Sequence, residues 1–372
     1  MLHGVDSPHE GAGNETPEHH GTAGGARDRH CGSAAIGRRR LRPAALTRPR
    51  RTVGHVLRYT IGRLVSAIPV LLVVSLVAFA IIALVPGDMA SEMAGPSATA
   101  EELQRLRVQL GLDKPILERM LDWYAALLLR GDLGESVLLR QSVTEAILER
   151  LPVTLSLTFL ALIIAIALGV LAGMIAAVRP NTWSDQGVMA TALVGLSLPD
   201  FWLGLVFIWI FAVQLGWLPT GGYVPFAEDP LGWLRAMAMP AGCLALTQMG
   251  LLARITRASM LDVLRQDFVR TARAKGLPGW VVVGKHAGAN VLIPVLTVAG
   301  VATGILLGGA VVIEQVFSLP GVGRLIIGAI QRRDYPVIQG GLLLTATIFV
   351  AVNLAVDLLY AAVDPRVRYD RR

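Results

Sequence analysis

The chain has 372 residues, of which 53% are apolar and only 16% are charged, and its mean hydropathy is +0.57. Soluble domains average about 25% charged residues, so this composition indicates an integral membrane protein. The formal net charge of +7 does not indicate nucleic-acid binding, because Lys and Arg gather at the ends of apolar runs rather than on one soluble face. The two cysteines, Cys31 and Cys243, suggest neither a disulfide framework nor a metal site.

Residues 1–52 have a different composition from the rest of the chain. Gly, His, Glu, Arg and Pro dominate, with almost no large apolar side chains, so the segment cannot bury enough surface to fold. The first long apolar run begins near Leu64, after Arg-rich sequence, which does not fit a signal peptide. We expect a disordered tail. Two alternatives stay open: a misassigned start codon, and metal binding by the five histidines found here.

Six apolar runs follow, each long enough to cross a bilayer as a helix, which takes roughly 20 residues. They are residues 64–85, 155–178, 188–215, 236–252, 291–313 and 338–363. The third run contains Pro199 and should be kinked or tilted, and the fourth is interrupted by Pro240, Gly242 and Gln248. The sequence therefore predicts an all-α integral membrane protein with six transmembrane helices.

The distribution of Lys and Arg between the runs predicts the orientation. The segment before the first run holds eleven, the second connection one, the fourth connection seven and the C-terminal tail four. The two short connections on the other side hold four between them. Both termini and the basic connection between the fourth and fifth runs should therefore face the cytoplasm.

The first external loop, residues 86–151, is unusually long. Its two amphipathic patterns, residues 101–112 and 116–129, predict helices. These helices would rest on the outer membrane surface or cap the permeation path, and a folded spacer is an equal alternative.

One acidic residue, Asp200, lies near the middle of the third run, beside Pro199. A charge at bilayer depth costs at least ~2.5 kcal/mol on insertion scales, so it should face a cavity or a partner. We take Asp200 and Gln248 as candidate residues of a translocation path, where Asp200 would meet a cationic group. In the alternative, the run is two shorter segments and Asp200 lies closer to water.

The connection between the fourth and fifth runs contains a basic amphipathic segment, residues 261–276. Leu261, Leu264, Phe268 and Ala272 recur at helical spacing, and the basic residues lie off that stripe. Gly276 should end the helix. Such a helix can lie on anionic lipid or dock into a groove on a soluble partner, and periodicity alone does not choose between these uses.

A second turn-rich segment, residues 314–323, begins at the outer end of the fifth run. Pro320, Gly321 and Gly323 force a turn next to apolar side chains that include Phe317. The pattern fits an ordinary turn over a buried apolar patch or a loop that closes the external mouth.

Four stretches together resemble one family. RTARAKG (270–276), followed by HAGANVLIP (286–294), resembles the coupling segment of ABC importer permeases, although it departs from the usual Glu-Ala-Ala form. EQVFSLPGVG (314–323), DYPVIQG (334–340) and DPRVR (364–368) agree with the peptide/nickel (dipeptide/oligopeptide) branch. Pro86-Gly87-Asp88 and the long first loop resemble the first permease of a two-permease pair.

The resemblance implies the type I ABC importer permease fold in a bacterial cell membrane. The chain would pair with a second, homologous permease, two cytoplasmic ABC ATPases and an extracellular solute-binding protein. ATP and Mg would bind to the ATPases, and this chain would bind no cofactor; it lacks a phosphate-binding Gly-rich loop with its Lys.

The same resemblance assigns two groups of residues. The coupling residues would be Asp267, Arg270, Thr271, Ala272, Arg273, Lys275 and Gly276. The external gate would comprise Glu314, Phe317, Pro320, Gly321 and Gly323.

We therefore expect a permease subunit, without enzymatic activity of its own, that forms half of a path for di- or oligopeptides. Nickel, opines or glutathione are alternative solutes. An ion-driven secondary transporter would show inverted repeats, which the sequence lacks, and a membrane-embedded enzyme would need a catalytic set, also lacking. The expected organisation is a cytoplasmic tail (1–52), a first transmembrane helix (53–86), an external loop (87–150), a five-helix core (151–363) that includes a coupling loop (257–290), and a C-terminal tail (364–372).

Overall fold

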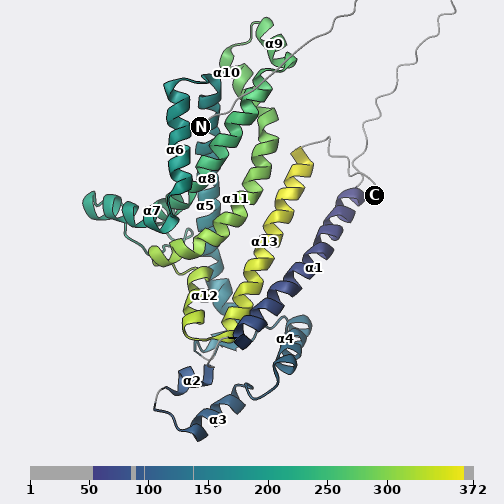
Figure 1. Ribbon diagram of the computed structural model, residues 1–372, viewed down its shortest axis with the longest axis vertical. Coiled ribbons are helices and arrows are strands. Elements are labelled where there is room, and N and C mark those ends of the chain that lie inside the picture. The colour runs from purple at the N-terminus through teal and green to yellow at the C-terminus, as the bar shows by residue number, and fades with distance from the viewer. Residues whose placement is uncertain (1–52, 85–88, 96, 137, 364–372) are drawn as a thin grey trace, which may run out of the picture. The chain divides into compact units, whose positions relative to one another are not determined.

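The computed structural model describes residues 53–84, 89–95, 97–136 and 138–363 (Figure 1). The two predicted tails and the motif at residues 364–368 lie outside this part of the chain. The described residues are almost entirely helical, with one short ribbon in which β1 (Glu135–Ser136) pairs antiparallel with β2 (Gln141–Ser142). The predicted all-α class is confirmed.

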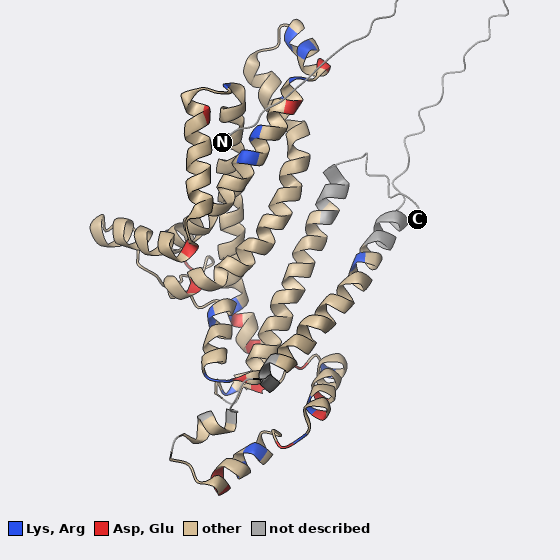
Figure 2. Cartoon of the chain, viewed as in Figure 1, with Lys and Arg blue, Asp and Glu red and all other residues tan. Residues whose placement is uncertain are grey.

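Five helical stretches are long and apolar enough to cross a membrane, and a bent helix pair makes a sixth candidate. The long helices are α1 (Val53–Leu84), α5 (Val143–Val178), α8 (Pro230–Leu264), α11 (Gly288–Val316) and α13 (Tyr335–Val363). The middles of these helices carry few charged residues. The charged residues gather near the helix ends and in the connections (Figure 2). This is the distribution expected when apolar helix middles lie in lipid.

The third apolar run forms the bent pair. Helix α6 (Trp183–Ser197) ends before Pro199, and α7 (Asp200–Phe207) continues into the π-helix η1 (Ile208–Gln214). The stretch formed by α7 and η1 lies at 105° to α6. Proline disfavours helical geometry in the residue before it, and Leu198 is extended, with φ −90° and ψ 134°. The predicted kink is confirmed, and it is sharp enough to divide the run into two helices.

Helices α5 and α8 pack closely because glycine faces the contact. A Cβ atom at Gly173 would lie 2.5 Å from the carbonyl oxygen of Ala253, and one at Gly169 would lie 2.8 Å from Cβ of Leu252. Lipid tails are as apolar as leucine side chains, so helices in a membrane associate through this kind of close packing. Helix α8 is the most buried of the candidate spans, and its polar residue Gln248 therefore lies inside the protein.

Helices α1 and α13 pack against each other, and α13 also packs on α11 (Figure 1). Glycine again allows the approach, because Cβ atoms at Gly300 and Gly304 of α11 would collide with Val356 and Phe349 of α13.

The segment between α1 and α5 contains α2 (Met89–Ala94), α3 (Ala100–Gln109) and α4 (Ile116–Arg130). Both predicted amphipathic helices are confirmed. Thr99 and Glu102 form a capping box that starts α3. Helix α4 contacts α1 through the Tyr124 hydroxyl, 2.5 Å from Oγ of Ser75.

A second cluster of buried residues lies at the end of the bundle that carries this segment. Helix α12 (Val322–Gln331) packs there against the first turns of α5 and α13. Val143, Ile147, Val322, Ile326 and Val337 form its centre. This cluster gives α12 a fixed position over the helix ends.

Candidate functional site

The predicted coupling segment lies at one end of the bundle, beyond α8 and α11, in a helical protrusion (Figure 1). Helix α9 (Asp267–Ala274) is followed by α10 (Gly279–Val281) and by the π-helix η2 (Val282–Ala287), which continues into α11. Val269 and Ala272 of α9 are buried and belong to the main apolar core together with Val282 and Ala287 of η2. The segment is therefore packed onto the bundle, joined to α8 by a short connection and directly continuous with α11.

The prediction of one helix through residues 261–276 is wrong. Helix α8 ends at Leu264, and Gln266, with φ −75° and ψ 152°, is the extended residue before α9. This break rotates the second helix relative to the first. Val269, fully buried, consequently takes the inward position that the periodicity gave to Phe268, which is 38% exposed.

The end of α9 has the geometry that its glycine allows. Gly276 has φ +75°, a left-handed conformation that favours glycine. Its amide donates to the Arg273 carbonyl, and the Leu277 amide donates to that of Ala272. These bonds close the last turn of the helix.

The exposed charged residues of this segment are mostly basic, and some of its exposed residues are apolar. Lys and Arg are visible at the α9 end in Figure 2. The predicted coupling residues Asp267, Arg270, Thr271, Arg273, Lys275 and Gly276 are all exposed, whereas Ala272 is buried. Trp280 exposes 79% of its surface beside them, and sequence analysis did not single it out. The sequence did contain a signal for Trp280, because it is an apolar residue directly after a Pro-Gly turn in a basic connection. Tryptophan and arginine are the residue types that most often anchor protein interfaces.

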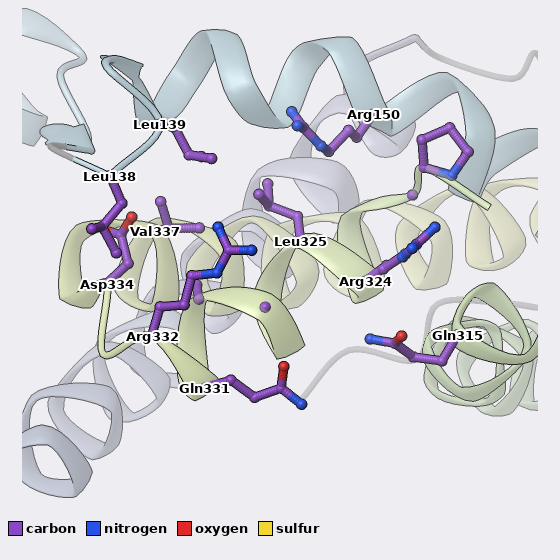
Figure 3. A pocket seen from close by; sticks show the side chains of 14 residues that line it. Leu138, Leu139, Arg150, Gln315, Arg324, Leu325, Gln331, Arg332, Asp334 and Val337 are labelled. Atoms are coloured by element: carbon purple, nitrogen blue, oxygen red, sulfur yellow. The ribbon is translucent and has the colours of Figure 1, made fainter. Parts of the chain in front are cut away.

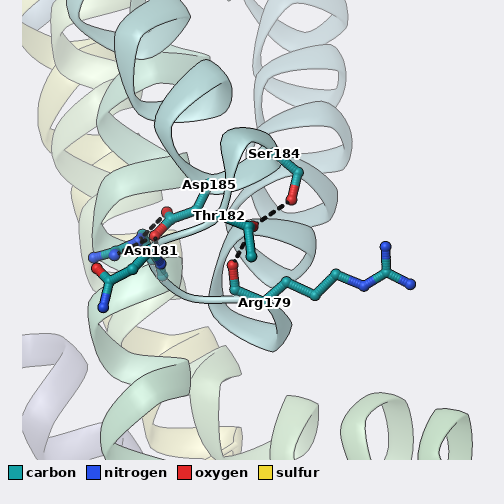
Figure 4. A network of polar contacts seen from close by, with 6 residues as sticks. Arg179, Asn181, Thr182, Ser184 and Asp185 are labelled. Atoms are coloured by element: carbon teal, nitrogen blue, oxygen red, sulfur yellow. Dashed lines mark hydrogen bonds and ion pairs between the residues drawn. The ribbon is translucent and has the colours of Figure 1, made fainter.

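A polar network ties α6 to α8 near the same end of the bundle (Figure 4). Arg257 donates two bonds to the Asp185 carboxylate, Nε to Oδ1 at 2.5 Å and Nη2 to Oδ2 at 2.6 Å. The Asn181 amide donates to the same Oδ2. Sequence analysis missed this pair, because its members are 72 residues apart and neither belongs to a recognised motif.

The candidate path residues lie near one another on different helices. Asp200 is the first residue of α7, where a carboxylate interacts favourably with the helix dipole, and it is half-buried. Its Oδ1 accepts a bond of 2.7 Å from Oγ1 of Thr247, the neighbour of Gln248 on α8. Gly309 of α11 leaves room for this carboxylate, since a Cβ there would lie 3.1 Å from Oδ2. Gln248 is itself buried, and its Oε1 has no hydrogen-bond partner among the described residues.

The candidate gate residues are organised around one buried carboxylate. Glu314 accepts a bond of 2.6 Å from Oγ1 of Thr154 and one of 2.9 Å from the Arg324 amide. The Gly323 amide also donates to it. Glu314 thus satisfies amides at the start of α12, while the Thr154 hydroxyl oxygen accepts from the Val322 amide at 2.9 Å.

The glycines and the aromatic residue of this motif have steric roles. A Cβ at Gly321 would overlap the Glu314 carboxylate, and one at Gly323 would lie 2.6 Å from Cα of Val311. Phe317 is buried against Gly204 and Gly221, and its carbonyl accepts from the Gly222 amide. Pro320 is exposed. The motif therefore builds a packed turn that orients α12.

A second buried carboxylate, Asp334, connects α12 and α13 with the loop that precedes α5. It accepts a hydrogen bond from the Ser136 hydroxyl of β1 and one from the Val337 amide. Burial raises the pKa of Asp334 above its ordinary value, because desolvation outweighs these two bonds, which lower it. The DYPVIQG motif (334–340) thus anchors the loop that precedes α5.

Comparisons with known proteins agree with this architecture. Residues 169–369 match the family described as "Binding-protein-dependent transport system inner membrane component", and residues 56–158 match the N-terminal model that accompanies it. A Brucella abortus (strain 2308) protein whose name describes a peptide transport system permease is 50% identical over 308 residues, which is 83% of this chain and 98% of that protein.

Two further relatives carry different solutes in their names. The dipeptide transport system permease protein DppB of Alkalihalophilus pseudofirmus is 44% identical over 335 residues, 84% of this chain and 100% of that protein. The glutathione transport system permease protein GsiC of Escherichia coli O6:H1 is 44% identical over 315 residues, with 84% and 100% covered.

Proposed function

We propose that the solute of this chain is a short peptide. The chain belongs to the family of inner membrane components of binding-protein-dependent transport systems, and it is therefore a multi-pass permease subunit of an ABC importer. The names of its relatives support this choice, because peptide and dipeptide permeases align with it over nearly their whole length. A glutathione permease aligns equally well, so glutathione, itself a modified tripeptide, is the second candidate solute.

Permeases of this family work with ATPase subunits and a solute-binding protein. We propose that the complete importer contains this chain, one second, similar permease, two ATPases and one external binding protein. ATP and Mg would bind to the ATPases. Both termini of this chain and the α9 end of the bundle would face the cytoplasm, as the Lys and Arg distribution predicts.

The observation that carries the coupling proposal is the construction of α9. Its inner residues Val269 and Ala272 are fixed to η2, and its outer residues present positive charge and the exposed Trp280. A force applied to this outer face would pass through η2 into α11 and across the short connection into α8. The Asp185–Arg257 pair would then carry α6 along with α8.

Two further roles follow for the other candidate groups. Asp200 and Gln248 would line the translocation path, where the Asp200 carboxylate would meet the amino terminus of a peptide. Residues 314–323 would take part in the external gate, with α12 moving as one unit around the Glu314 carboxylate, because that carboxylate holds the start of the helix.

The coupling proposal is tested by copurifying the ATPases with the variants Arg273→Glu/Lys275→Glu and Trp280→Ala. All three side chains are exposed, so the permease should still insert and purify, while bound ATPase and ATP-driven uptake should fall together at least about tenfold. Arg235→Glu, an exposed arginine at the start of α8, is the matched control. Normal ATPase recovery and normal uptake in both test variants would disprove the assignment.

The solute proposal is tested by uptake of labelled Ala-Leu into cells that contain the complete importer. Unlabelled di- and tripeptides should compete, and nickel ions should not. Competition by glutathione alone would transfer the assignment to the second candidate.

A further inference from the structure

A cavity of about 410 Å³ lies between α12, the first turns of α5 and the loop after β1 (Figure 3). It is at the end of the bundle opposite α9. Apolar side chains line part of it: Leu138, Leu139, Leu325 and Val337. Its volume falls in the range of about 300–1,000 Å³ that is typical of small-molecule sites.

Three arginines surround the apolar part of this cavity. Arg150 comes from α5, and Arg324 and Arg332 come from the two ends of α12, so that their side chains lie around Leu325 in Figure 3. Two amide side chains, Gln315 and Gln331, and the Asp334 carboxylate also belong to the polar part of the lining.

The positive charge of the cavity is only partly neutralised. Arg150 has Glu149 at 3.6 Å and donates to the Ala146 carbonyl. Arg324 and Arg332 have no ion-pair partner within the described part of the chain. The Asp334 carboxylate also borders the cavity and accepts from Ser136 of β1, and it can offset at most one of the three positive charges.

A guanidinium group that lines a concave apolar site is suited to a carboxylate, which it can bind through two parallel hydrogen bonds. We propose that this cavity binds a carboxylate carried next to an apolar side chain, and that the C-terminal end of a short peptide supplies it. This inference rests on the proposed function for the nature of the solute. It adds a receiving site at the external mouth, separate from the candidate path residues Asp200 and Gln248.

The structure also explains why the arginines are held in place. Arg324 follows the Glu314–Thr154 cap, and its own amide donates to Glu314. Arg332 follows the last residue of α12, next to the Asp334 anchor. Both ends of α12 are therefore fixed, so Arg324 projects from the anchored first turn of the helix and Arg332 from the anchored residue directly after it.

The test measures equilibrium binding of Ala-Leu and of its C-terminal amide to the full chain in lipid nanodiscs, without binding protein. Ala-Leu should bind, and the amide should bind at least about tenfold more weakly. Arg324→Gln and Arg332→Gln should each weaken Ala-Leu binding by about tenfold or more, with little effect on the amide. Arg235→Gln should behave like the unchanged chain, because Arg235 does not line the cavity.

Equal binding of acid and amide, or unchanged binding in both arginine variants, would overturn the inference. A second result would also overturn it: arginine variants that bind Ala-Leu normally but no longer copurify with the binding protein. The arginines would then contact a carboxylate of the binding protein rather than that of the peptide. Uptake of Ala-Leu by the complete importer separates the two proposals. Absence of uptake contradicts the proposed solute, whereas uptake with an insensitive cavity contradicts only this site.

Discussion

At the scale of single residues, the buried Thr154 hydroxyl is the most informative contact. It donates to Glu314 and accepts from the Val322 amide, so Thr154→Val, which keeps the shape, removes both bonds. We expect a loss of about 1–3 kcal/mol in stability, because a buried carboxylate and a buried amide each lose a partner. The measurement is thermal unfolding of the purified permease. Thr297→Val is the control, since that exposed hydroxyl bonds only within its own helix; equal destabilisation by both variants would contradict the prediction.

The Asp334 carboxylate should give stability a specific pH dependence. Its folded-state pKa is raised by burial above the ordinary 3.8, so the folded chain holds this proton more tightly than the unfolded chain does. Stability should therefore fall as pH rises from 3.8 through the raised folded pKa, and then level off. Asp334→Asn should lose this component when thermal midpoints are compared across pH. A variant with an unchanged pH profile would show that Asp334 does not contribute.

Sequence analysis recognised the motifs that contain these residues but could not assign their contacts. Glu314 and Asp334 were visible as parts of family-like stretches. Their partners, Thr154 and Ser136, are 160 and 198 residues away, and no local pattern marks either of them. The steric need for Gly321 likewise appears only once the Glu314 side chain is placed beside it.

At the scale of elements, helix α9 makes the sharpest prediction through Gly276. Proline cannot adopt the φ of +75° found there and would remove the amide that donates to Arg273, so Gly276→Pro should loosen the end of α9. ATP-driven uptake should fall strongly while the permease still inserts into the membrane. Gly279→Ala, at a nearby exposed glycine without positive φ or steric contact, should retain uptake. Uptake by the proline variant equal to that of this control would contradict the coupling role.

The structure also changes which substitutions test α9 cleanly. The resemblance places Ala272 and Arg273 among the coupling residues and so suggests Ala272→Glu combined with Arg273→Glu as a test, but Ala272 is only 7% exposed. A glutamate there would disrupt the packing of α9 on η2 and would confuse docking with folding. The resemblance and the apolar stripe disagree about Ala272, and the structure agrees with the stripe. The break at Gln266, which no residue type marks in the sequence, exchanges only Phe268 for Val269 on the inner side. The break at Pro199, by contrast, was predictable, since proline acts locally.

At the scale of the whole molecule, the apolar runs and the charge distribution predicted most of the architecture. Hydropathy identifies membrane helices well because every unpaired backbone group in lipid is costly. The sequence could not show that α8 is the central, most buried helix. Its interruptions at Pro240 and Gln248 lowered the apparent signal, and these residues are tolerated because protein rather than lipid surrounds them.

The last prediction concerns orientation. Single cysteines at Lys275 and Arg130 would occupy exposed positions at the α9 end and in the segment that contains α4. In a chain whose own Cys31 and Cys243 are replaced by serine, a membrane-impermeant maleimide should label the cysteine at position 130 in intact spheroplasts. The cysteine at position 275 should react only after the membrane is opened, because the basic connection stays on the cytoplasmic side. Labelling of both positions from outside would contradict the six-span topology, since one span would then be missing between them. Labelling of position 275 alone from outside would show that the orientation is the reverse of the predicted one. Helix α9 would then lie beyond the reach of any cytoplasmic ATPase.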